Sequence, residues 1–342
     1  MKAIRIHQHG DPSVLTSEDA PVPACGDDGF LLDVKAASVN HLDLWVRRGM
    51  PGVKIPLPRI PGADAAGVVR AVGKNVTSIR PGQRVLLCPQ TSCGHCEYCG
   101  DGENSMCRDW QIFGEHCDGT YAEVVAAPAY CAVPIPDSMD FVTAAAPGLV
   151  FLTAWRLTVT RGRLKPGEDV LIHGVGAGVG TVCLQIAKML GARAIVTASS
   201  DDKLAKAKAL GADVCLNYAK DDWLKKVREA TSKRGVDLVV DYIGKETWSK
   251  SLMALRRGGR LTTCGATTGY DPTEDIRQIF YRQLEIIGCT MGSAKEFSDA
   301  MRCFFQGRLK PVIDSTFPLK DAAEAHRRIE SRSVFGKIVL TV

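Results

Sequence analysis

Apolar residues in the first 130 positions occur in short runs that glycine and proline interrupt. Such runs, alternating with polar positions, predict short strands. Four of them are expected at residues 30–34, 67–72, 84–87 and 121–125. A series of short strands without intervening helices is typical of a β-rich domain.

From residue 169 the pattern changes, and strand-like runs alternate with helical periodicity. The expected strands are 169–173, 194–198, 236–241, 260–264 and 285–289, and the expected helices are 179–190 and 201–210. Gly191 and Gly211 follow these two helices, as glycines commonly do at helix ends. Alternating strands and helices predict a doubly wound parallel sheet.

The last fifty residues contain a predicted helix, 294–306, and a closing strand, 337–341. We expect this segment to rejoin the β-rich domain. The predicted organisation is therefore a catalytic domain of residues 1–150 and 292–342, and a cofactor domain of residues 151–291.

The chain length of 342 residues fits two domains. A net charge of +5 without a long basic run gives no reason to expect nucleic acid, and no apolar stretch reaches the roughly 20 residues of a membrane span. Thirteen cysteines, an odd number in a long chain, argue against a disulfide framework. We expect a cytoplasmic protein that acts on a small-molecule substrate.

A glycine-rich turn lies between the first strand and the first helix of the second domain. Its residues include Gly174, Gly176, Gly178, Val179 and Gly180. Glycines at these positions allow the backbone to approach a pyrophosphate at the helix N-terminus. The turn predicts a dinucleotide site; the alternative is a tight turn without a ligand.

The end of the following strand bears on which dinucleotide binds. An acidic residue there would contact the ribose hydroxyl of NAD, but the strand ends in Ser199 and Ser200. Ser199 and Lys203 are able to bind a 2′-phosphate, although Lys203 also suits a solvated helix surface. We therefore expect NADP(H) in preference to NAD(H).

Four cysteines follow the spacing C-x2-C-x2-C-x7-C within residues 88–110. They are Cys93, Cys96, Cys99 and Cys107. Four thiolates complete a tetrahedral shell around Zn²⁺ and leave no open position, so we expect one structural zinc ion per chain. An iron–sulfur cluster and a metal-free thiol cluster are the alternatives.

Together, these motifs resemble the medium-chain dehydrogenase/reductase superfamily of zinc-containing alcohol dehydrogenases and quinone oxidoreductases. The segments that carry the resemblance are the cysteine lobe, residues 38–43, 61–67, 174–180 and 210–218. The resemblance implies an α/β fold with a GroES-like β-rich catalytic domain and a Rossmann domain. It also implies an active site in the cleft between them and a homodimer or homotetramer that pairs through strand 285–289.

The zinc alcohol dehydrogenases bind a second, catalytic zinc, and the matching positions differ in this chain. They read Asn40, Ala63 and a residue near Val150, with Asp64 directly after Ala63. Alanine and valine have no metal-binding atoms, and asparagine is a poor zinc ligand. We therefore expect an NAD(P)H-dependent reductase of activated alkenes, quinones or related carbonyls that works without active-site zinc.

Four residues are candidates for catalysis. Asn40 is expected to contact substrate or nicotinamide, or else to cap a loop. Asp43 is expected to orient neighbours or to join a proton relay, and Asp64 to support other site residues. His116 is a candidate proton shuttle, or a ligand with Asp43 or Asp64 of an unusual metal site, or a structural histidine.

The resemblance further assigns residues to the cofactor. Thr153 would lie against the nicotinamide, Tyr218 beside the adenosine phosphate, Gly265 and Ala266 beside the carboxamide, and Lys337 near the cofactor. Ordinary packing or turn formation is the alternative for each of them.

Two other functions remain open at this point. One is an alcohol dehydrogenase whose catalytic metal has nonstandard ligands or is dispensed with. The other is an NADPH-binding sensor with little turnover.

Overall fold

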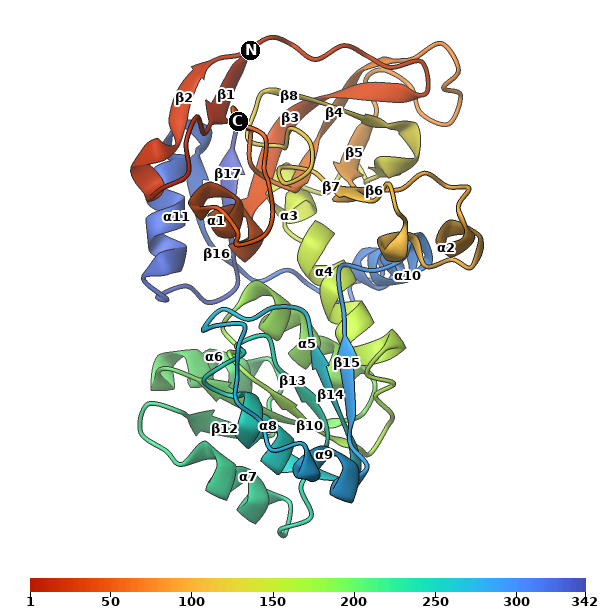
Figure 1. The fold of residues 1–342 in the computed structure, drawn as a ribbon. Helices are drawn as coiled ribbons and strands as arrows, with labels where there is room; N and C mark the ends of the chain where they lie inside the picture. Colours follow the sequence, from red (N-terminus) through yellow and green to blue (C-terminus); the bar gives the residue numbers. More distant parts are fainter. The chain divides into compact units, whose positions relative to one another are not determined.

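The computed structural model describes residues 1–342, which form two compact units (Figure 1). The first unit comprises Met1–Val150 and Pro311–Val342, and the second comprises Phe151–Lys310. The predicted α/β class is confirmed: the first unit is rich in strands, and the second alternates strands with helices.

The second unit extends further than the sequence predicts, to Lys310 and not only to residue 291. The reason is helix α10 (Ala294–Phe305), which packs within the second unit. Phe304 of α10 meets Phe151 edge to face, with ring centroids 5.8 Å apart. Glu296 of the same helix forms a buried ion pair with Arg156 at 2.8 Å.

The first unit is built on a seven-stranded sheet with the order β16-β17-β3-β4-β5-β9, in which β8 also pairs with β3. Its strands are β3 (Gly29–Val39), β4 (Asp64–Val72), β5 (Arg84–Leu87), β8 (Val124–Pro128), β9 (Ala132–Pro134), β16 (Ile313–Pro318) and β17 (Lys337–Thr341). The predicted strand at 121–125 thus begins three residues later than expected. The long central strand β3 places segments from both ends of the chain side by side.

Two small sheets and several short helices complete the first unit. The sheets pair β1 (Lys2–Arg5) with β2 (Thr16–Asp19) and β6 (Gln90–Thr91) with β7 (Gln111–Ile112). The helices are α1 (His41–Arg48), α2 (Glu97–Gly100), α3 (Phe141–Ala145) and α11 (Ala322–Glu330), with 3-10 turns η1 (Pro12–Val14), η2 (Asn104–Met106), η3 (Ala129–Cys131) and η5 (Leu319–Asp321). Helix α4 (Gly148–Trp155) contains the boundary between the units.

The second unit contains a six-stranded parallel sheet with the order β12-β11-β10-β13-β14-β15, which confirms the predicted doubly wound architecture. The strands are β10 (Asp169–Ile172), β11 (Arg193–Ala198), β12 (Val214–Asn217), β13 (Val236–Val240), β14 (Leu255–Thr263) and β15 (Glu285–Gly288). The other helices are α5 (Gly178–Met189), α6 (Asp201–Ala209), α7 (Trp223–Ala230), α8 (Trp248–Ala254) and α9 (Arg277–Arg282), with a π-helical turn at η4 (Arg156–Thr160). The strand order reverses between β10 and β13, the point where such sheets bind ligands.

Apolar side chains fill both faces of this sheet. On one face, Leu171, Ile195, Val239 and Leu261 pair across four neighbouring strands and are completely buried. On the other face, the paired residues Val170 and Leu238 are completely buried as well. Near-continuous apolar strands are typical of parallel sheets that helices cover on both faces. No helix of the chain is both long enough and apolar enough to cross a membrane.

Candidate active site and zinc lobe

Three neighbouring strands of the first unit bring Asn40, Asp64 and Lys337 together. Asp64 begins β4 opposite Ser38 of β3, and Lys337 directly precedes Ile338, which pairs with Val39. Asn40 follows the end of β3. Its Nδ2 donates to Asp64 Oδ2 at 2.8 Å, and its Oδ1 accepts from Lys337 Nζ at 2.5 Å. These opposite partners fix the orientation of the Asn40 amide.

Asp64 is fully buried, and both of its carboxylate oxygens are bound. Oδ2 accepts from Ser38 Oγ at 2.8 Å as well as from Asn40, and Oδ1 accepts from the backbone N–H of Leu149 at 2.7 Å. Gly148 permits the close approach, because a Cβ atom there would lie 2.3 Å from Oδ1. Asp64 therefore holds Ser38, Asn40 and the backbone of Leu149 in place through its two carboxylate oxygens.

The Lys337 ammonium is buried among three acceptors. Besides Asn40 Oδ1, it donates to the carbonyl of Val39 at 2.9 Å and lies 3.5 Å from Asp64 Oδ2. Burial lowers the pKa of Lys337, while the nearby carboxylates of Asp64 and Asp43 oppose this shift. The structure ties the Lys337 ammonium to Asn40 and Asp64, and the expected place of Lys337 near the cofactor stays a prediction.

The residues around Asn40 do not fit a second zinc ion. The side chains of Ala63 and Val150 are buried and carry no ligand atoms, and the polar atoms of the Asn40 amide already have partners. The neighbouring Lys337 ammonium would repel a divalent cation at short range. The metal-binding group of the chain, with three or more His, Cys, Asp or Glu side chains close together, is the cysteine lobe. The residues around Asn40 do not belong to that group.

A second buried network is connected, through Asp43, to the cluster of Asn40, Asp64 and Lys337. Asp43 Oδ2 accepts from the backbone N–H of Asn40 and from Tyr121 Oη, both at 2.8 Å. Tyr121 Oη lies 3.4 Å from His326 Nε2, and His326 Nδ1 lies 3.3 Å from Arg47 Nη1. A chain of polar contacts thus connects Asn40 with α11.

Burial has opposite effects on the acids and bases of this network. It raises the pKa of Asp43 to about 7, although the hydrogen bonds from Asn40 and Tyr121 and the charge of Lys337 oppose it. It also raises the pKa of Tyr121 well above its ordinary value. Burial together with the charges of Arg47 and Arg48 lowers the pKa of His326 to about 3, so His326 is neutral.

The predicted cofactor residues of the second unit follow strands at one edge of the sheet. The turn after β10 contains Gly174, Gly176 and Gly178, and α5 begins at Gly178. The first backbone N–H of α5 that donates to a carbonyl of the turn is that of Thr181, which lies 2.9 Å from the Ala177 carbonyl oxygen. The N–H groups of Gly178, Val179 and Gly180 precede it, as suits an anion site at a helix N-terminus.

Other predicted residues lie after neighbouring strands. Ser199 follows β11, the half-exposed Tyr218 follows β12, and Gly265 and Ala266 follow β14. Because carboxyl ends of parallel strands meet at one edge, the fold brings these residues to the same side as the glycine turn. Thr153 is buried in α4, where its hydroxyl contacts the sulfur of Met291 at 3.9 Å.

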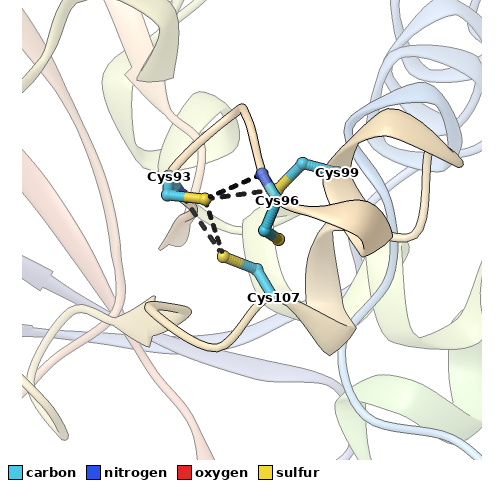
Figure 2. Close-up of side chains that lie close together, drawn as sticks. All are labelled: Cys93, Cys96, Cys99 and Cys107. Atoms are coloured by element: carbon cyan, nitrogen blue, oxygen red, sulfur yellow. Dashed lines mark hydrogen bonds between the residues drawn. The ribbon is translucent and has the colours of Figure 1, made fainter.

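The four cysteines of the lobe point toward one another (Figure 2), and their Sγ atoms all lie within 4.8 Å. A tetrahedral zinc site with Zn–S bonds of about 2.3 Å requires sulfur atoms about 3.8 Å apart, and Cys93 Sγ lies 3.5 Å from Cys107 Sγ and 4.0 Å from Cys99 Sγ. Backbone N–H groups of Cys93 and Cys96 point at sulfurs of the cluster, at 3.3 Å from Cys107 Sγ and 3.4 Å from Cys93 Sγ. These residues would hold a structural zinc ion, while His95 is exposed.

Known protein families match both units. The alcohol dehydrogenase GroES-like domain matches residues 26–137, and the zinc-binding dehydrogenase family matches residues 178–306. An alcohol dehydrogenase of Geobacillus stearothermophilus is 33% identical over 344 residues, covering all of both chains. This chain belongs to the medium-chain dehydrogenase/reductase superfamily.

Further relatives of this medium-chain dehydrogenase/reductase carry two kinds of name. A quinone oxidoreductase of Homo sapiens is 30% identical and aligns with 99% of this chain and 97% of its own. A solved structure of a NAD-dependent alcohol dehydrogenase is 46% identical, has a TM-score of 0.96 and covers all of both chains. The chain is therefore an oxidoreductase that uses a nicotinamide cofactor.

The hydrogen bond and the ring contact of His116 are with residues of its own loop. Its Nδ1 accepts from the backbone N–H of Ile112 at 3.2 Å, and its ring meets Trp110 edge to face. His116 does not form a metal-binding group with Asp43 or Asp64 in the structure. These contacts are those of a structural histidine, and the proton-shuttle role of His116 stays a prediction.

Three members of the polar network escape prediction from sequence. Tyr121, His326 and Arg47 lie 78 or more positions away from a partner in the network, so spacing along the chain gives no indication of them. One signal exists for His326: it lies on the buried face of α11 with Ala322 and Ala325. A polar residue on an apolar helix face requires a partner, because an unpaired buried polar group is costly.

Proposed function

We propose that this protein reduces activated alkenes, quinones or related carbonyls with a hydride from NADPH, and that it does so without an active-site zinc ion. The observation that carries the proposal is the Lys337 ammonium between Asn40 Oδ1 and Asp64 Oδ2. In the superfamily resemblance, Asn40 and Ala63 take the places of metal ligands. A buried ammonium at this position favours chemistry that hydrogen bonds alone can support.

When bound, the nicotinamide supplies the hydride. The hydride adds to the β-carbon of an α,β-unsaturated carbonyl, the π electrons move to the carbonyl oxygen to give an enolate, and a proton then adds at the α-carbon. Hydrogen-bond donors stabilise such an enolate without a Lewis acid. A simple alcohol–carbonyl couple depends more strongly on a metal to stabilise an alkoxide.

Asn40 is the residue we assign to the substrate oxygen. One hydrogen of its Nδ2 donates to Asp64 at 2.8 Å, but the other has only the Ser38 carbonyl, at 3.5 Å. That second hydrogen is available to a substrate oxygen. Lys337 and Asp64 are positioning residues, since they hold the two ends of the amide.

The test is NADPH oxidation against a panel of quinones, enones, enoyl-CoA thioesters, aldehydes and ketones, with zinc measured on the same sample. We expect quinones or enones to be reduced by protein that contains about one zinc ion per chain. Reduction of aldehydes and ketones alone, or two zinc ions per chain, would contradict the proposal. NADPH binding without turnover of any compound would also contradict it and would favour a sensor.

Two variants separate the role of Asn40 from general damage. Asn40→Ala should lower kcat about tenfold or more and leave the Kd for NADPH unchanged, because it removes a donor to the developing charge. Asn75→Ala is the matched control, since Asn75 is exposed and also donates from Nδ2 to a carboxylate, that of Asp28 at 2.9 Å.

The second candidate is an alcohol dehydrogenase, which the names of several relatives favour. It requires either metal ligands other than Asn40, Ala63 and Val150 or alkoxide stabilisation by Lys337 and Asn40. The same panel distinguishes it, because simple alcohols would then be oxidised at rates comparable with quinone reduction.

We further propose NADP(H) as the preferred cofactor. No carboxylate follows β11 directly: Ser199 occupies that position, and Ser200 caps α6. Asp201 is engaged with Lys220 at 2.6 Å and with Asn217 at 2.6 Å. We expect kcat/KM to be more than about tenfold higher with NADPH than with NADH. A higher kcat/KM with NADH would overturn the preference. Ser199→Asp should shift the ratio toward NADH.

Two other observations support our inferences on the oligomeric state and the cellular compartment. Strand β15 is an edge of the parallel sheet, Ile286 on it is exposed, and Ile276, Phe280 and Tyr281, which precede β15 in the sequence, are exposed as well. Such an edge favours pairing with a second copy, so we infer a homodimer or a tetramer of dimers. All thirteen cysteines are unpaired, which supports a reducing compartment such as the cytoplasm.

A further inference from the structure

A chain of buried polar side chains lies beneath the glycine turn of the second unit. His173 is the last residue before Gly174, and its ring nitrogens contact Thr197 Oγ1 at 3.2 Å and Ser251 Oγ at 3.0 Å. Ser251 Oγ donates to Asp241 Oδ2 at 2.6 Å. His173, Thr197, Ser251 and Asp241 are all at most 2% exposed.

The chain begins at the backbone of the turn itself. The N–H of Gly174 donates to Thr197 Oγ1 at 3.2 Å, and Gly174 has the positive φ of +57° that reverses the chain at this point. The carbonyl of Gly174 accepts from Tyr242 Oη at 3.0 Å. Both polar groups of the first glycine in the turn are therefore held by buried side chains.

The hydrogen bonds run in one direction. Because Ser251 donates its single proton to Asp241, its oxygen must accept from His173 Nε2–H. His173 Nδ1 then carries a lone pair and accepts from the Thr197 hydroxyl, whose oxygen accepts from the Gly174 N–H. Burial lowers the pKa of His173, which is consistent with this neutral tautomer.

Asp241 anchors the far end of the chain. Its Oδ1 accepts from the backbone N–H groups of Ile243 and Gly244 at 2.9 and 3.2 Å, and Thr247 Oγ1 donates to Oδ2 at 2.7 Å. A carboxylate with this many donors is a rigid anchor. The four side chains come from β10, β11, α8 and the end of β13, so they tie the turn to both halves of the sheet.

We propose that the Thr197–His173–Ser251–Asp241 chain is a positioning device that sets the affinity of the glycine turn for the nicotinamide dinucleotide. The proposal rests on the assignment of the Gly174–Gly180 turn as the cofactor site. With Gly174 held inward, the later N–H groups of the turn stay oriented before the pyrophosphate arrives, which lowers the ordering cost of binding. None of the four side chains needs to touch the cofactor.

Thr197→Val tests the link next to the turn, because it keeps the shape of the side chain and removes the hydroxyl. The Kd for NADPH, measured by its fluorescence, should rise about three- to tenfold, the equivalent of one hydrogen bond. The kcat at saturating NADPH should stay within about twofold. Thr197→Ser, which restores the hydroxyl, should return the Kd close to that of the original protein.

Thr231→Val is the matched control. Thr231 is also buried in the second unit, and its Oγ1 accepts from the backbone N–H of a glycine, Gly235, at 3.1 Å. The variant loses the same kind of bond at the end of α7, so it should lower Tm by an amount similar to Thr197→Val without raising the Kd. Equal increases in Kd for the two variants would overturn the proposal.

Ser251→Ala tests whether the effect travels along the chain. Ser251 lies 78 positions from His173, and its hydroxyl bonds to His173 and Asp241. We expect its Kd for NADPH to rise about two- to fourfold, because His173 loses the acceptor that fixes its tautomer. An unchanged Kd for Ser251→Ala would overturn the proposed chain beyond Thr197.

One further variant distinguishes failure of this proposal from failure of the cofactor-site assignment. A Cβ atom at Gly180 would lie 2.5 Å from Tyr242 Oη, so Gly180→Ala must distort the turn. If Gly180→Ala weakens NADPH binding and Thr197→Val does not, the turn is the site and the positioning chain is refuted. If neither variant changes the Kd, the cofactor-site assignment itself is refuted.

Discussion

Lys337 and Asp64, 273 positions apart, form a buried ion pair at 3.5 Å that joins the last strand of the first unit to its β4. Both side chains are almost fully buried, at 4% and 0% exposed. The pair lies where the superfamily resemblance places a catalytic metal.

Lys337→Met should destabilise the protein by about 3 kcal/mol, because it leaves the Asp64 carboxylate buried without its cation. The double variant Lys337→Met with Asp64→Asn should recover part of this loss, since both charges are then gone. The measurement is urea unfolding of each protein. Lys2→Met is the control, because the Lys2–Asp19 pair is exposed and should contribute nothing measurable to the free energy of unfolding. The pairing would be contradicted if the double variant lost more unfolding free energy than the two single variants lose together.

The raised pKa of Asp43 gives a pH dependence with a definite sign. Its pKa is about 7 in the folded protein and 3.8 ordinarily, so the folded state binds a proton that the unfolded chain has released. Stability from this group is greatest below about pH 3.8, falls as the pH rises to about 7 and is constant above that.

The measurement is the difference in unfolding free energy between the original protein and Asp43→Asn, from pH 4 to pH 8. Taking this difference removes the titration of His326 and of other groups that both proteins share. Tyr121, Lys337 and Asp64 face Asp43 and remain in both proteins. A difference that stays level, or that grows with rising pH, would show that Asp43 is ionised throughout.

Loss of one thiol should release the structural metal. Cys107→Ser is expected to lower zinc content well below one per chain and to lower Tm by about 5 °C or more, since the site then lacks its fourth thiolate. Metal content is measured by mass spectrometry on the purified protein. Cys25→Ser, outside the lobe, should leave the zinc content and the Tm unchanged. Iron in place of zinc in the original protein would refute the zinc assignment.

The oligomer should depend on the edge of the second sheet. Ile286→Lys places a charge on β15 and should convert the dimer to monomers at micromolar concentration, as measured by light scattering. Val53→Lys, an equally exposed apolar position in the first unit, should leave the assembly intact. A monomeric original protein would refute the proposed assembly at once.

Local patterns explain why much of the fold is predictable from the sequence. The cysteine lobe closes within 15 residues, and the glycine turn lies between adjacent elements, so spacing alone locates both. The alternation of strands and helices likewise determines the parallel sheet. The domain boundary is harder, because α10 has the same periodicity whichever unit it packs against, and its contacts with Phe151 and Arg156 decide the matter.

The candidate site is less predictable, because its partners are distant in sequence. Asn40 and Asp64 are visible in motifs, but the pairing of Lys337 with them depends on the register of β17 against β3. The chain from His173 to Asp241 depends likewise on how α8 packs on the sheet. Hydrogen bonds across such distances leave no periodic trace in the sequence.

The placement of β17 between β16 and β3 also bears on how the chain matures during synthesis. Residues 151–310 are continuous, so the second unit can fold as soon as they leave the ribosome. The first unit must wait, because β17 and Lys337 follow the whole of the second unit along the chain. A nascent chain therefore carries a complete second unit while the β-sheet of the first unit is still open, and the polar cluster around Asn40 is completed only once β17 has been made.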